Sequence, residues 1–460
     1  MISLTLNDLQ KISGSSVLYP KEGEIFDGPV RGISIDTRTL QPREVFWAIK
    51  GDTFDGHWYV NEAENKGAVA AVVEKKKAKL LPRLNIPLIL VKNTLKSLQQ
   101  FSAWHRARFN IPVIALTGTN GKTTTKEMIA WILQTKYSIH KTIGNLNNHI
   151  GTPLTLLRLN SKHDISVIEL GTNHPGEIRL LSTLVTPTSA MITNIGRGHL
   201  EFFSNIDGVA REKLSLFKAV RRSGTIYLNF DDTKLSEARI RRKNMWSYSL
   251  EKRKISRVKG RLIGLSDEGF GVWELNGKTK IRMRVPGIQN VHNALAASAV
   301  GLSFDIEEKI IKAALEDYNA YDKRMQIIKN KHSLIINDSY NANPDSFGPA
   351  LKTLVHLAKG KNRRKIVVVG DMLELGKNSN QLHQELFNQL MQYKVEGIFT
   401  YGPQCQIAAD FIRQKGLENV YSFSTHEELA KKLTQYLKSG DIILLKGSRG
   451  MQMERVLAYL

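Results

Sequence analysis

The sequence predicts an α/β protein of several domains with mainly parallel sheets. Three observations lead to this prediction. Short apolar runs alternate with segments of helical apolar spacing from residue 113 onward. The same alternation starts again at Ser333. The chain has 460 residues, which suggests two to four domains.

The first 93 residues predict a small α/β unit. Strand-like runs occur at Glu44–Gly51 and Ala68–Glu74, and Thr94–Asn110 then predicts a helix. Polar residues cluster around these short strands. They are either turn-forming residues or the lining of a pocket for an anionic, hydroxyl-rich ligand. These residues are Asp36, Thr37, Arg38, Asp55, Gly56 and His57.

The best-defined motif follows at residues 113–134, VIALTGTNGKTTTKEMIAWILQ. A strand-like run, a glycine loop and a helical segment give the layout of a phosphate-binding loop, where backbone N–H groups and a helix N-terminus meet phosphate oxygens. Lys122 can reach the β- and γ-phosphates, and the Thr123 hydroxyl can ligate Mg²⁺. Because Leu116 replaces the first glycine of the long pattern, the motif is a shortened GxxGKT, and a chance glycine turn is the alternative.

Two further predicted strands, Ile165–Ile168 and Ala190–Ile195, are followed by Glu169 and His199. Ligands of parallel sheets bind beyond the carboxyl ends of the strands. We therefore expect Thr123, Glu169 and His199 to lie at one edge, where they suit Mg²⁺ or phosphate. A surface glutamate and a hydrogen-bonded loop histidine are the alternatives.

The remaining segments complete the α/β pattern. Residues 224–284 predict short strands, Pro286–Gly301 a helix and Asp317–Gln326 a linker. A second α/β unit then carries the strands SLIIND, KIVVVGD, GIFTYG, NVYSF and DIILLKG, and we expect it to end in a helix, Arg449–Leu460. Its loops NDSYNANPDS and KGSRG suit a nucleotide or a carboxylate.

The composition favours a soluble cytoplasmic protein. The single cysteine, Cys405, excludes an intrachain disulfide, and we expect a buried or incidental thiol. We find neither a leader pattern nor an apolar run long enough to span a membrane. The formal charge of +23 suggests the hypothesis that the protein binds nucleic acid. However, the basic residues are scattered, and their densest cluster, Arg241–Arg261, has few aromatic residues. We expect no nucleic-acid partner.

Four segments resemble the Mur ligases, the ATP-dependent peptide ligases of peptidoglycan synthesis. They are TGTNGKTTT, GNLNNHIGTPLTLL, ELGTNHPGEI and TNIGRGHLEFF. NDSYNANPDS, VVVGDMLELG and LLKGSRGMQMERV are similar to the branch that adds D-alanyl-D-alanine to UDP-N-acetylmuramoyl-tripeptide. The resemblance covers nearly the whole chain. It implies a UDP-sugar domain (1–93), a central ATP-binding domain (94–318) and a Rossmann-like domain (319–460), in a monomeric protein.

The resemblance also implies residue roles. Lys122, Lys213 and His199 would be catalytic. The metal ligands would be Thr123, Glu169, His199 and a carbamylated Lys213. ATP would contact Gly118, Thr119, Asn120, Gly121, Lys122, Thr123, Thr124, Asn293, Arg324 and Asp338. The substrates would contact Ser34, Asp36, Thr37, Arg38, Asp55, Gly56, His57, Asn145, Asn147, Tyr340, Asn341, Asn343, Lys446, Ser448 and Arg449.

The implied cofactors, ATP and Mg²⁺, agree with the chemistry of peptide ligation. A carboxylate repels the γ-phosphate of ATP, so cations must cancel that repulsion and fix an in-line geometry. An acyl phosphate hydrolyses readily, so closure of the third domain would exclude water. Two alternatives stay open: a sibling ligase that adds diaminopimelate or lysine to the dipeptide precursor, and a nucleic-acid-dependent P-loop ATPase.

Overall fold

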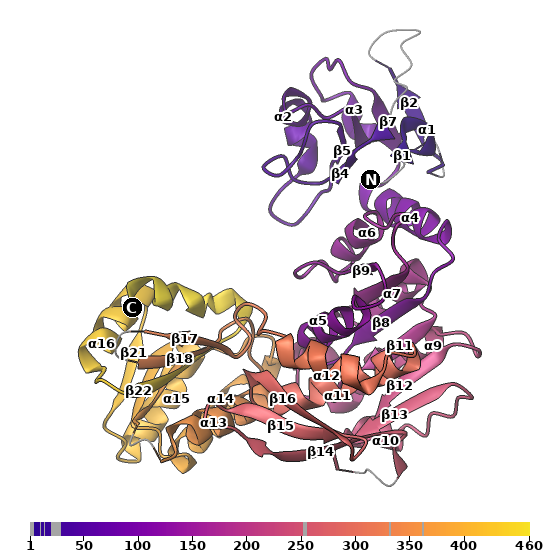
Figure 1. Cartoon of the computed structure of the whole chain (residues 1–460). Helices are drawn as coiled ribbons and strands as arrows, with labels where there is room; N and C mark the ends of the chain where they lie inside the picture. Colours follow the sequence, from indigo (N-terminus) through magenta and orange to yellow (C-terminus); the bar gives the residue numbers. More distant parts are fainter. Residues whose placement is uncertain are drawn as a thin grey trace. The chain divides into compact units, whose positions relative to one another are not determined.

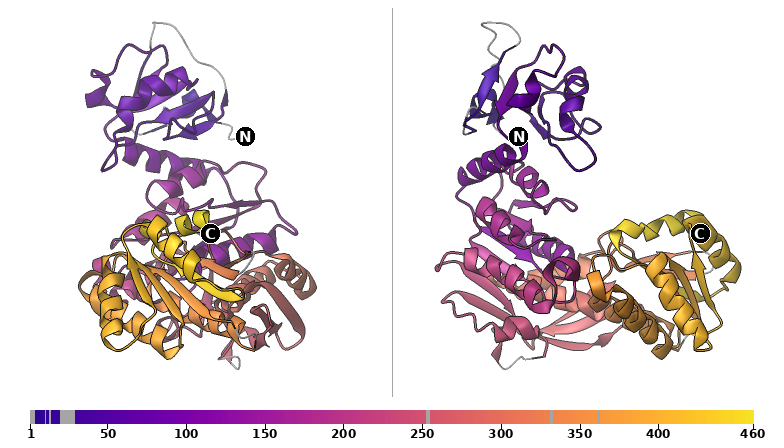
Figure 2. Two further views of the ribbon diagram at one scale, coloured as in Figure 1. Left: turned by 90° about the vertical axis from the view of Figure 1, so that its left-hand side faces the viewer. Right: turned by 180° about the vertical axis from the view of Figure 1, so that it is seen from behind.

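The computed structural model describes residues 4–9, 11–12, 14–19, 29–251, 255–330, 333–360 and 363–460. Internal contacts divide the chain into two compact units. One comprises residues 1–115, 137–172 and 176–189, and the other comprises 116–136, 173–175 and 190–460. Helices alternate with strands of mainly parallel sheets (Figures 1 and 2), which confirms the predicted fold class.

The N-terminal sheet has the strand order β2-β7-β6-β5-β4, and only the β2–β7 pair is antiparallel. Val45 and Trp47 pack into one core, whereas Phe46 packs into a second core. Both faces are thus covered, which explains the continuous apolar runs. The elements are β1 (Leu4–Thr5), α1 (Leu6–Leu9), β2 (Ser16–Leu18), β3 (Pro29–Val30), β4 (Gly32–Ser34), β5 (Glu44–Trp47), η1 (Gly56–Tyr59), α2 (Val60–Asn65), β6 (Ala70–Glu74), α3 (Lys75–Ala78) and β7 (Leu88–Val91).

The second sheet has nine strands in the order β16-β15-β14-β13-β12-β11-β8-β10-β9. Its strands are β8 (Val113–Thr117), β9 (Ile139–Lys141), β10 (Ile165–Glu169), β11 (Ser189–Ile192), β12 (Thr225–Asn229), β13 (Met245–Ser249), β14 (Val258–Leu265), β15 (Phe270–Leu275) and β16 (Thr279–Pro286). Strands β14 to β16 pair antiparallel, whereas β12–β13 and β13–β14 are parallel. The basic cluster lies around β13 and β14, and its residues 252–254 fall outside the described ranges.

Three helices of this region, those predicted at Thr94–Asn110, directly after the glycine loop and within Pro286–Gly301, lie close to their predicted positions. The predicted linker Asp317–Gln326 separates α12 from β17, and its residues 318–325 form neither helix nor strand. The helices are α4 (Thr94–Ala107), α5 (Lys122–Leu133), α6 (Gly151–Leu156), α7 (Glu177–Val185), α8 (Leu200–Phe203), α9 (Ile206–Ala219), α10 (Thr233–Glu237), α11 (Ile288–Ser303) and α12 (Glu308–Asp317).

The C-terminal sheet has the order β17-β18-β22-β19-β20-β21, and only β17 is antiparallel to its neighbour. Helix α16 covers one face through Leu429 and Leu433, and α13 and α14 lie across the strands from it (Figure 1). The elements are β17 (Gln326–Lys329), β18 (Ser333–Asp338), α13 (Pro344–Ala358), β19 (Lys365–Gly370), η3 (Gly376–Asn378), α14 (Ser379–Gln392), β20 (Gly397–Tyr401), α15 (Pro403–Gln414), β21 (Val420–Phe423), α16 (His426–Tyr436) and β22 (Asp441–Lys446).

The predicted helix at Arg449–Leu460 is wrong in type. Two 3₁₀ segments, η4 (Arg449–Met451) and η5 (Met453–Tyr459), occupy this stretch. Gln452 between them is left-handed, with φ of 47°, and this conformation interrupts a continuous α-helix.

None of the helices in the described ranges combines the length and apolar character that crossing a membrane requires.

Candidate active site

The phosphate-binding loop joins β8 to α5, as predicted. Gly118 and Gly121 are required there by close approaches. A Cβ on Gly118 would lie 1.8 Å from Thr193 Oγ1, and one on Gly121 would lie 2.4 Å from Asn293 Oδ1. Gly121 also has a φ of 78° at the start of α5. These glycines keep the loop tight, so that the N-terminus of α5 is available to phosphate.

Lys122 is folded over its own loop. Its Nζ donates hydrogen bonds to the carbonyls of Gly118 at 2.8 Å and Thr119 at 3.2 Å. Thr119 Oγ1 in turn accepts a hydrogen bond from Gly196 N at 2.8 Å, and Thr124 is buried within α5. The predicted loop residues therefore form one bonded group around a fixed cation.

The predicted nucleotide residues beyond the loop also contact it. Asn293 Oδ1 accepts a hydrogen bond from Thr125 Oγ1 at 3.2 Å. Arg324 Nη2 donates to Thr123 Oγ1 at 2.9 Å, and its guanidinium lies 3.9 Å from the ring centroid of Tyr340. The structure thus places Arg324 on the hydroxyl predicted to ligate Mg²⁺.

Glu169 is the last residue of β10, as expected, and it is only 2% exposed. Its Oε1 accepts a hydrogen bond from Asn147 Nδ2 at 2.8 Å. Its Oε2 is buried and has no hydrogen-bond partner among the described residues. A buried carboxylate oxygen in this condition is costly unless a further group satisfies it, and a hard cation such as Mg²⁺ fits it. Asn145, also predicted here, is exposed.

His199 precedes α8 in a left-handed conformation with φ of 57°. Its Nδ1 lies 2.5 Å from Oε2 of Glu374, but the geometry of this contact is not that of a hydrogen bond. The contact with His199 is the main reason that the pKa of Glu374 is below its ordinary value. Since Nδ1 faces this carboxylate, Nε2 is the ring nitrogen available to a cation.

Lys213 lies on α9 and is 1% exposed. Burial lowers its pKa well below the ordinary value, and the positive charge of Lys122 adds to this effect. Within the described part of the chain no ion pair with Lys213 occurs. Burial and the nearby charge of Lys122 thus favour the neutral amine over the ammonium, and the neutral amine is the form that reacts with CO₂.

Neighbouring parallel strands bring the predicted C-terminal residues together. Asp338 and Lys446 are paired at the ends of β18 and β22, and their side chains form an ion pair at 2.5 Å. Lys446 Nζ also donates to the carbonyl of Asn341 at 3.1 Å. Ser448 Oγ accepts a hydrogen bond from Leu373 N at 2.8 Å, and Arg449 pairs with Glu454 at 2.6 Å.

Asn343 has a role that sequence reasoning did not assign. Its side chain caps α13, and its amide exchanges two hydrogen bonds with Asn120 of the phosphate-binding loop, at 2.7 and 3.3 Å. Nearby, Arg197 donates to Asp345 at 2.6 and 2.8 Å and to Glu385 at 3.0 Å. These contacts seat the N-terminus of α13 on the phosphate-binding loop.

Several predicted residues of the N-terminal sheet are bonded to each other. Asp36 pairs with Arg38 at 2.6 Å, and Ser34 Oγ donates to the carbonyl of Asp36 at 3.0 Å. The Thr37 carbonyl accepts a hydrogen bond from Lys66 at 3.0 Å. Gly56 packs so closely that a Cβ there would lie 2.8 Å from Ile49 N. These contacts shape the loops at the strand ends.

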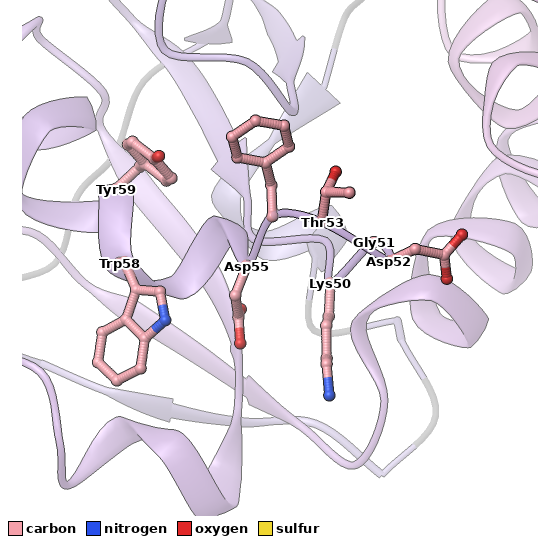
Figure 3. Close-up of a pocket in the computed structure, with 8 residues that line it drawn as sticks. Lys50, Gly51, Asp52, Thr53, Asp55, Trp58 and Tyr59 are labelled. Carbon is pink, nitrogen blue, oxygen red and sulfur yellow. The ribbon is translucent and has the colours of Figure 1, made fainter.

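A pocket of about 280 Å³ lies beside these residues (Figure 3). Its lining combines charged and aromatic side chains, and Phe54 and Trp58 are 70% and 65% exposed. The lining residues are Lys50, Gly51, Asp52, Thr53, Phe54, Asp55, Trp58 and Tyr59. Aromatic faces beside charged groups suit a planar polar ring.

Asp55 holds this pocket wall in place. Its carboxylate caps η1, contacts Nδ1 of His57 at 2.6 Å and pairs with Lys77. His57 is buried, and its Nε2 accepts a hydrogen bond from Glu74 N at 2.9 Å. Burial favours the neutral acid, but Lys77 and His57 outweigh it and lower the pKa of Asp55 to about 2.

We expect Asp55→Ala to destabilise the N-terminal sheet by about 1–2 kcal/mol, because a helix cap and two charge contacts are lost. The measurement is urea denaturation at pH 7. Since the folded-state pKa is lowered, the contribution of Asp55 is present at neutral pH and is lost as the pH falls towards 2. The difference between variant and wild type should therefore shrink on acidification. An equal difference at every pH would contradict this role.

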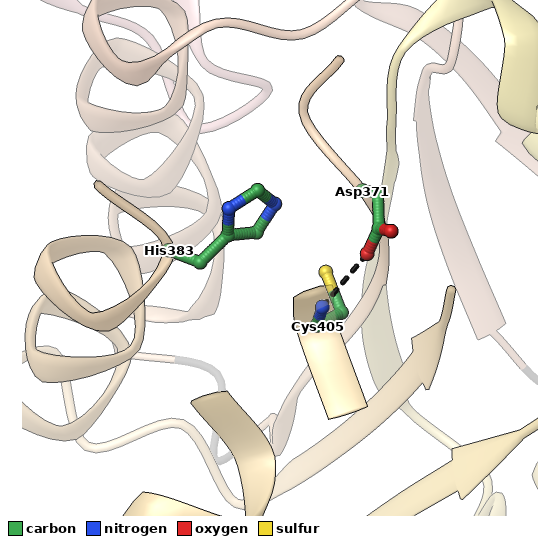
Figure 4. A group of neighbouring side chains, drawn as sticks. All are labelled: Asp371, His383 and Cys405. Atoms are coloured by element: carbon green, nitrogen blue, oxygen red, sulfur yellow. Dashed lines mark hydrogen bonds between the residues drawn. The ribbon is translucent and has the colours of Figure 1, made fainter. Parts of the chain in front are cut away.

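A buried cluster of Asp371, His383 and Cys405 was not predicted as a group (Figure 4). Asp371 accepts hydrogen bonds from Cys405 N at 2.7 Å and Gln404 N at 3.1 Å, and so caps α15. Both nitrogens of His383 have partners, Met372 N at 3.0 Å and the Ser379 carbonyl at 2.8 Å. Because both ring nitrogens of His383 are engaged in these hydrogen bonds, the cluster serves to link secondary-structure elements. Cys405 is buried, as predicted.

Comparison with known proteins adds the family. The description "Mur ligase family, catalytic domain" matches residues 29–106, "Mur ligase middle domain" matches 116–301 and "Mur ligase, glutamate ligase domain" matches 323–449. A relative from Buchnera aphidicola, named UDP-N-acetylmuramoyl-tripeptide–D-alanyl-D-alanine ligase, is 34% identical over 100% of this chain and 98% of its own. This chain belongs to the Mur ligase family.

Solved structures agree with this Mur ligase over nearly its whole length. The crystal structure of MurF from Acinetobacter baumannii gives a TM-score of 0.86 at 30% identity and covers 99% of this chain and 98% of that chain. MurF ligase from Thermotoga maritima, solved in complex with ADP, gives a TM-score of 0.80 at 27% identity. The match covers 94% of this chain and 97% of that chain. The resemblance seen in the sequence and the three-domain α/β architecture are thereby confirmed.

Proposed function

We propose that this Mur ligase joins D-alanyl-D-alanine to the terminal carboxylate of UDP-N-acetylmuramoyl-tripeptide and converts ATP to ADP and phosphate. The observation that carries the proposal is the similarity, at 34% identity over 100% of the chain, to a relative whose name states these substrates. The phosphate-binding loop supports the use of ATP.

The reaction has two steps. A carboxylate oxygen of the tripeptide attacks the γ-phosphorus, the bond to the β,γ-bridging oxygen breaks, and ADP leaves. The amine of D-alanyl-D-alanine then attacks the acyl carbon, phosphate leaves, and the nitrogen loses a proton. Both reactants of the first step are anionic, so the site must supply fixed positive charge.

Lys122 supplies one such charge at the loop, where two backbone carbonyls fix its ammonium. Mg²⁺, when bound, neutralises phosphate charge and orients the γ-phosphate. Thr123, Glu169 and His199 are the side chains that we propose hold it. The partnerless Oε2 of Glu169 and the ring nitrogen left by the Glu374 contact support this assignment.

Lys213 is proposed as a carbamate. Its neutral amine attacks the carbon of CO₂, one N–C bond forms, and the nitrogen releases a proton. The product carries a negative charge where the amine was neutral. A carbamate suits a site next to Mg²⁺, whereas an ammonium there would be repelled.

Arg324 and the C-terminal loops are proposed to govern entry of the substrates. The Arg324 guanidinium must release the Thr123 hydroxyl before a cation can bind to that hydroxyl. Tyr340, Asn341, Lys446, Ser448 and Arg449 are proposed to line the acceptor side, and Asp338 to contact ATP. The pocket at Lys50–Tyr59 is proposed to receive the uracil end of the donor. We further propose that the protein is a cytoplasmic monomer.

The decisive experiment is phosphate release with purified protein, ATP and UDP-N-acetylmuramoyl-tripeptide. Release should require D-alanyl-D-alanine, and the product should gain the mass of the dipeptide. Diaminopimelate and lysine, offered with the dipeptide precursor, test the sibling activity. Release that depends on added nucleic acid instead would overturn the proposal.

Glu169→Ala and His199→Ala should each raise the Mg²⁺ concentration needed for half-maximal rate and lower kcat. Loss of a residue that supports a metal ligand typically costs about 10–100-fold in metal affinity, and loss of a ligand itself should cost at least as much. Binding of the UDP substrate should remain, since the N-terminal sheet is unchanged. A Mg²⁺ titration of initial rates, together with calorimetry of UDP-substrate binding, makes the measurement. Wild-type behaviour of either variant would remove that residue from the metal site.

A further inference from the structure

The loop after β19 is seated firmly on α8. The carbonyl of Glu374 accepts a hydrogen bond from Glu201 N at 3.1 Å. Gly376 approaches the same residue, and a Cβ on it would lie 3.0 Å from Glu201 Cα. The loop therefore brings a carboxylate of the C-terminal sheet to the residue that precedes α8, His199.

Both residues of this contact have unusual backbones. Glu374 has a φ of 62° and His199 a φ of 57°, a left-handed conformation that residues other than glycine rarely adopt. Such conformations persist where the surrounding structure over-determines them, and they cluster at functional sites. An ordinary exposed ion pair does not require such backbones.

The carboxylate is directed at a group of basic side chains. Its Oε2 lies 2.5 Å from Nδ1 of His199, whose side chain is 19% exposed. His174, whose ring is tilted against that of Phe202 of α8 with 4.4 Å between the centroids, and Lys122 also lower the pKa of Glu374. The Glu374 side chain is 37% exposed, and its carboxylate oxygen faces His199, in the loop that follows β11.

We propose that Glu374 is a positioning residue that holds the His199 ring so that Nε2 is presented to the divalent cation. The inference rests on the proposed function, because it takes His199 as a metal ligand. Histidine ligands depend on a partner at the second ring nitrogen, which fixes the ring and raises its basicity. This partner is contributed by the loop that follows β19 of the C-terminal sheet.

Glu385 provides a matched control. It belongs to the same group of contacts between α13, α14 and the loop before α8, but it pairs with Arg197 at 3.0 Å rather than with His199. Glu385→Gln and Glu374→Gln remove the same charge from the same region. Only the second removes the negative charge that faces the imidazole.

The experiment is a Mn²⁺ titration of the full-length protein with a non-hydrolysable ATP analogue, with free Mn²⁺ counted by electron paramagnetic resonance. Glu374→Gln should raise the Kd for Mn²⁺ about 10–100-fold, and His199→Ala should raise it at least as much. Glu385→Gln should stay close to wild type. Circular dichroism establishes that each variant is folded.

The outcomes separate the two proposals. A raised Kd for His199→Ala with a wild-type Kd for Glu374→Gln would overturn the role of Glu374 and leave the metal site intact. Wild-type values for both variants would overturn the metal assignment of His199 as well. If Glu385→Gln raised the Kd for Mn²⁺ by the same factor, Glu374 would only help to dock the C-terminal sheet and would not position His199, which overturns the inference. If Glu374→Gln does not fold, Glu374→Asp, which withdraws the carboxylate from Nδ1, is expected to raise Kd, and an unchanged value overturns the inference.

Discussion

Lys122→Ala is expected to reduce kcat for ligation by at least about 10²–10³. The loss of one fixed charge contact to the reacting phosphate is worth roughly 3 kcal/mol or more. The contact is fixed because the carbonyls of Gly118 and Thr119 hold Nζ over the loop before any substrate binds. Phosphate release at saturating ATP and Mg²⁺, with both substrates present, measures the effect.

Lys136→Ala is the matched control for Lys122. Lys136 follows the same helix, is exposed, and its replacement removes the same charge. It should leave kcat close to that of wild type. The variant at position 122 should still bind the UDP substrate, because that binding is assigned to the N-terminal sheet. A kcat near the wild-type value in Lys122→Ala would exclude Lys122 from phosphoryl transfer.

Local patterns predicted much of this site. Gly118 and Gly121 were predicted to let the backbone approach phosphate, and the structure shows that Thr193 Oγ1 and Asn293 Oδ1 leave no room for a Cβ at these positions. Asp338 and Lys446 were predicted from two separate loops. They meet because parallel neighbours end at the same edge of a sheet.

Contacts between distant segments could not be predicted. Glu374 stands in a loop whose sequence, DMLELG, signals only a turn, and its contact with His199 depends on how the C-terminal sheet is seated. Asn343 was expected to bind substrate, yet its side chain bonds Asn120, because both lie where α13 meets the phosphate-binding loop. Single-sequence patterns describe one segment at a time and carry no signal for such pairs.

Polar residues around the N-terminal strands show the opposite difficulty. Asp55 and His57 looked equally suited to a ligand or to a turn. The structure has the carboxylate capping η1, and His57 accepting a bond from Glu74 N. The exposed aromatic residues Phe54 and Trp58, which line the pocket, carried no distinctive spacing in the sequence.

Lys213 is the residue for which burial and charge make the sharpest case. A lysine that is 1% exposed and has no ion-pair partner among the described residues is costly as an ammonium. The structure thus gives a physical reason for a neutral amine at this position of α9. The side chain is buried, so Lys213 is not a surface lysine that pairs with Glu212.

Lys213→Ala is expected to lower kcat by on the order of 10²-fold or more, because the proposed carbamate oxygens are lost from the metal site. Short-chain carboxylates such as acetate or propionate should restore part of the activity by filling the vacated space. Lys213→Glu should retain more activity than Lys213→Ala, since it keeps an anionic oxygen on a shorter stem.

Lys218→Ala, which replaces an exposed lysine on the same helix, is the control and should be unaffected. Wild-type enzyme stripped of CO₂ and bicarbonate should lose activity and regain it when bicarbonate is added. Full activity in Lys213→Ala, or in the stripped wild type, would show that the buried amine has only a structural role.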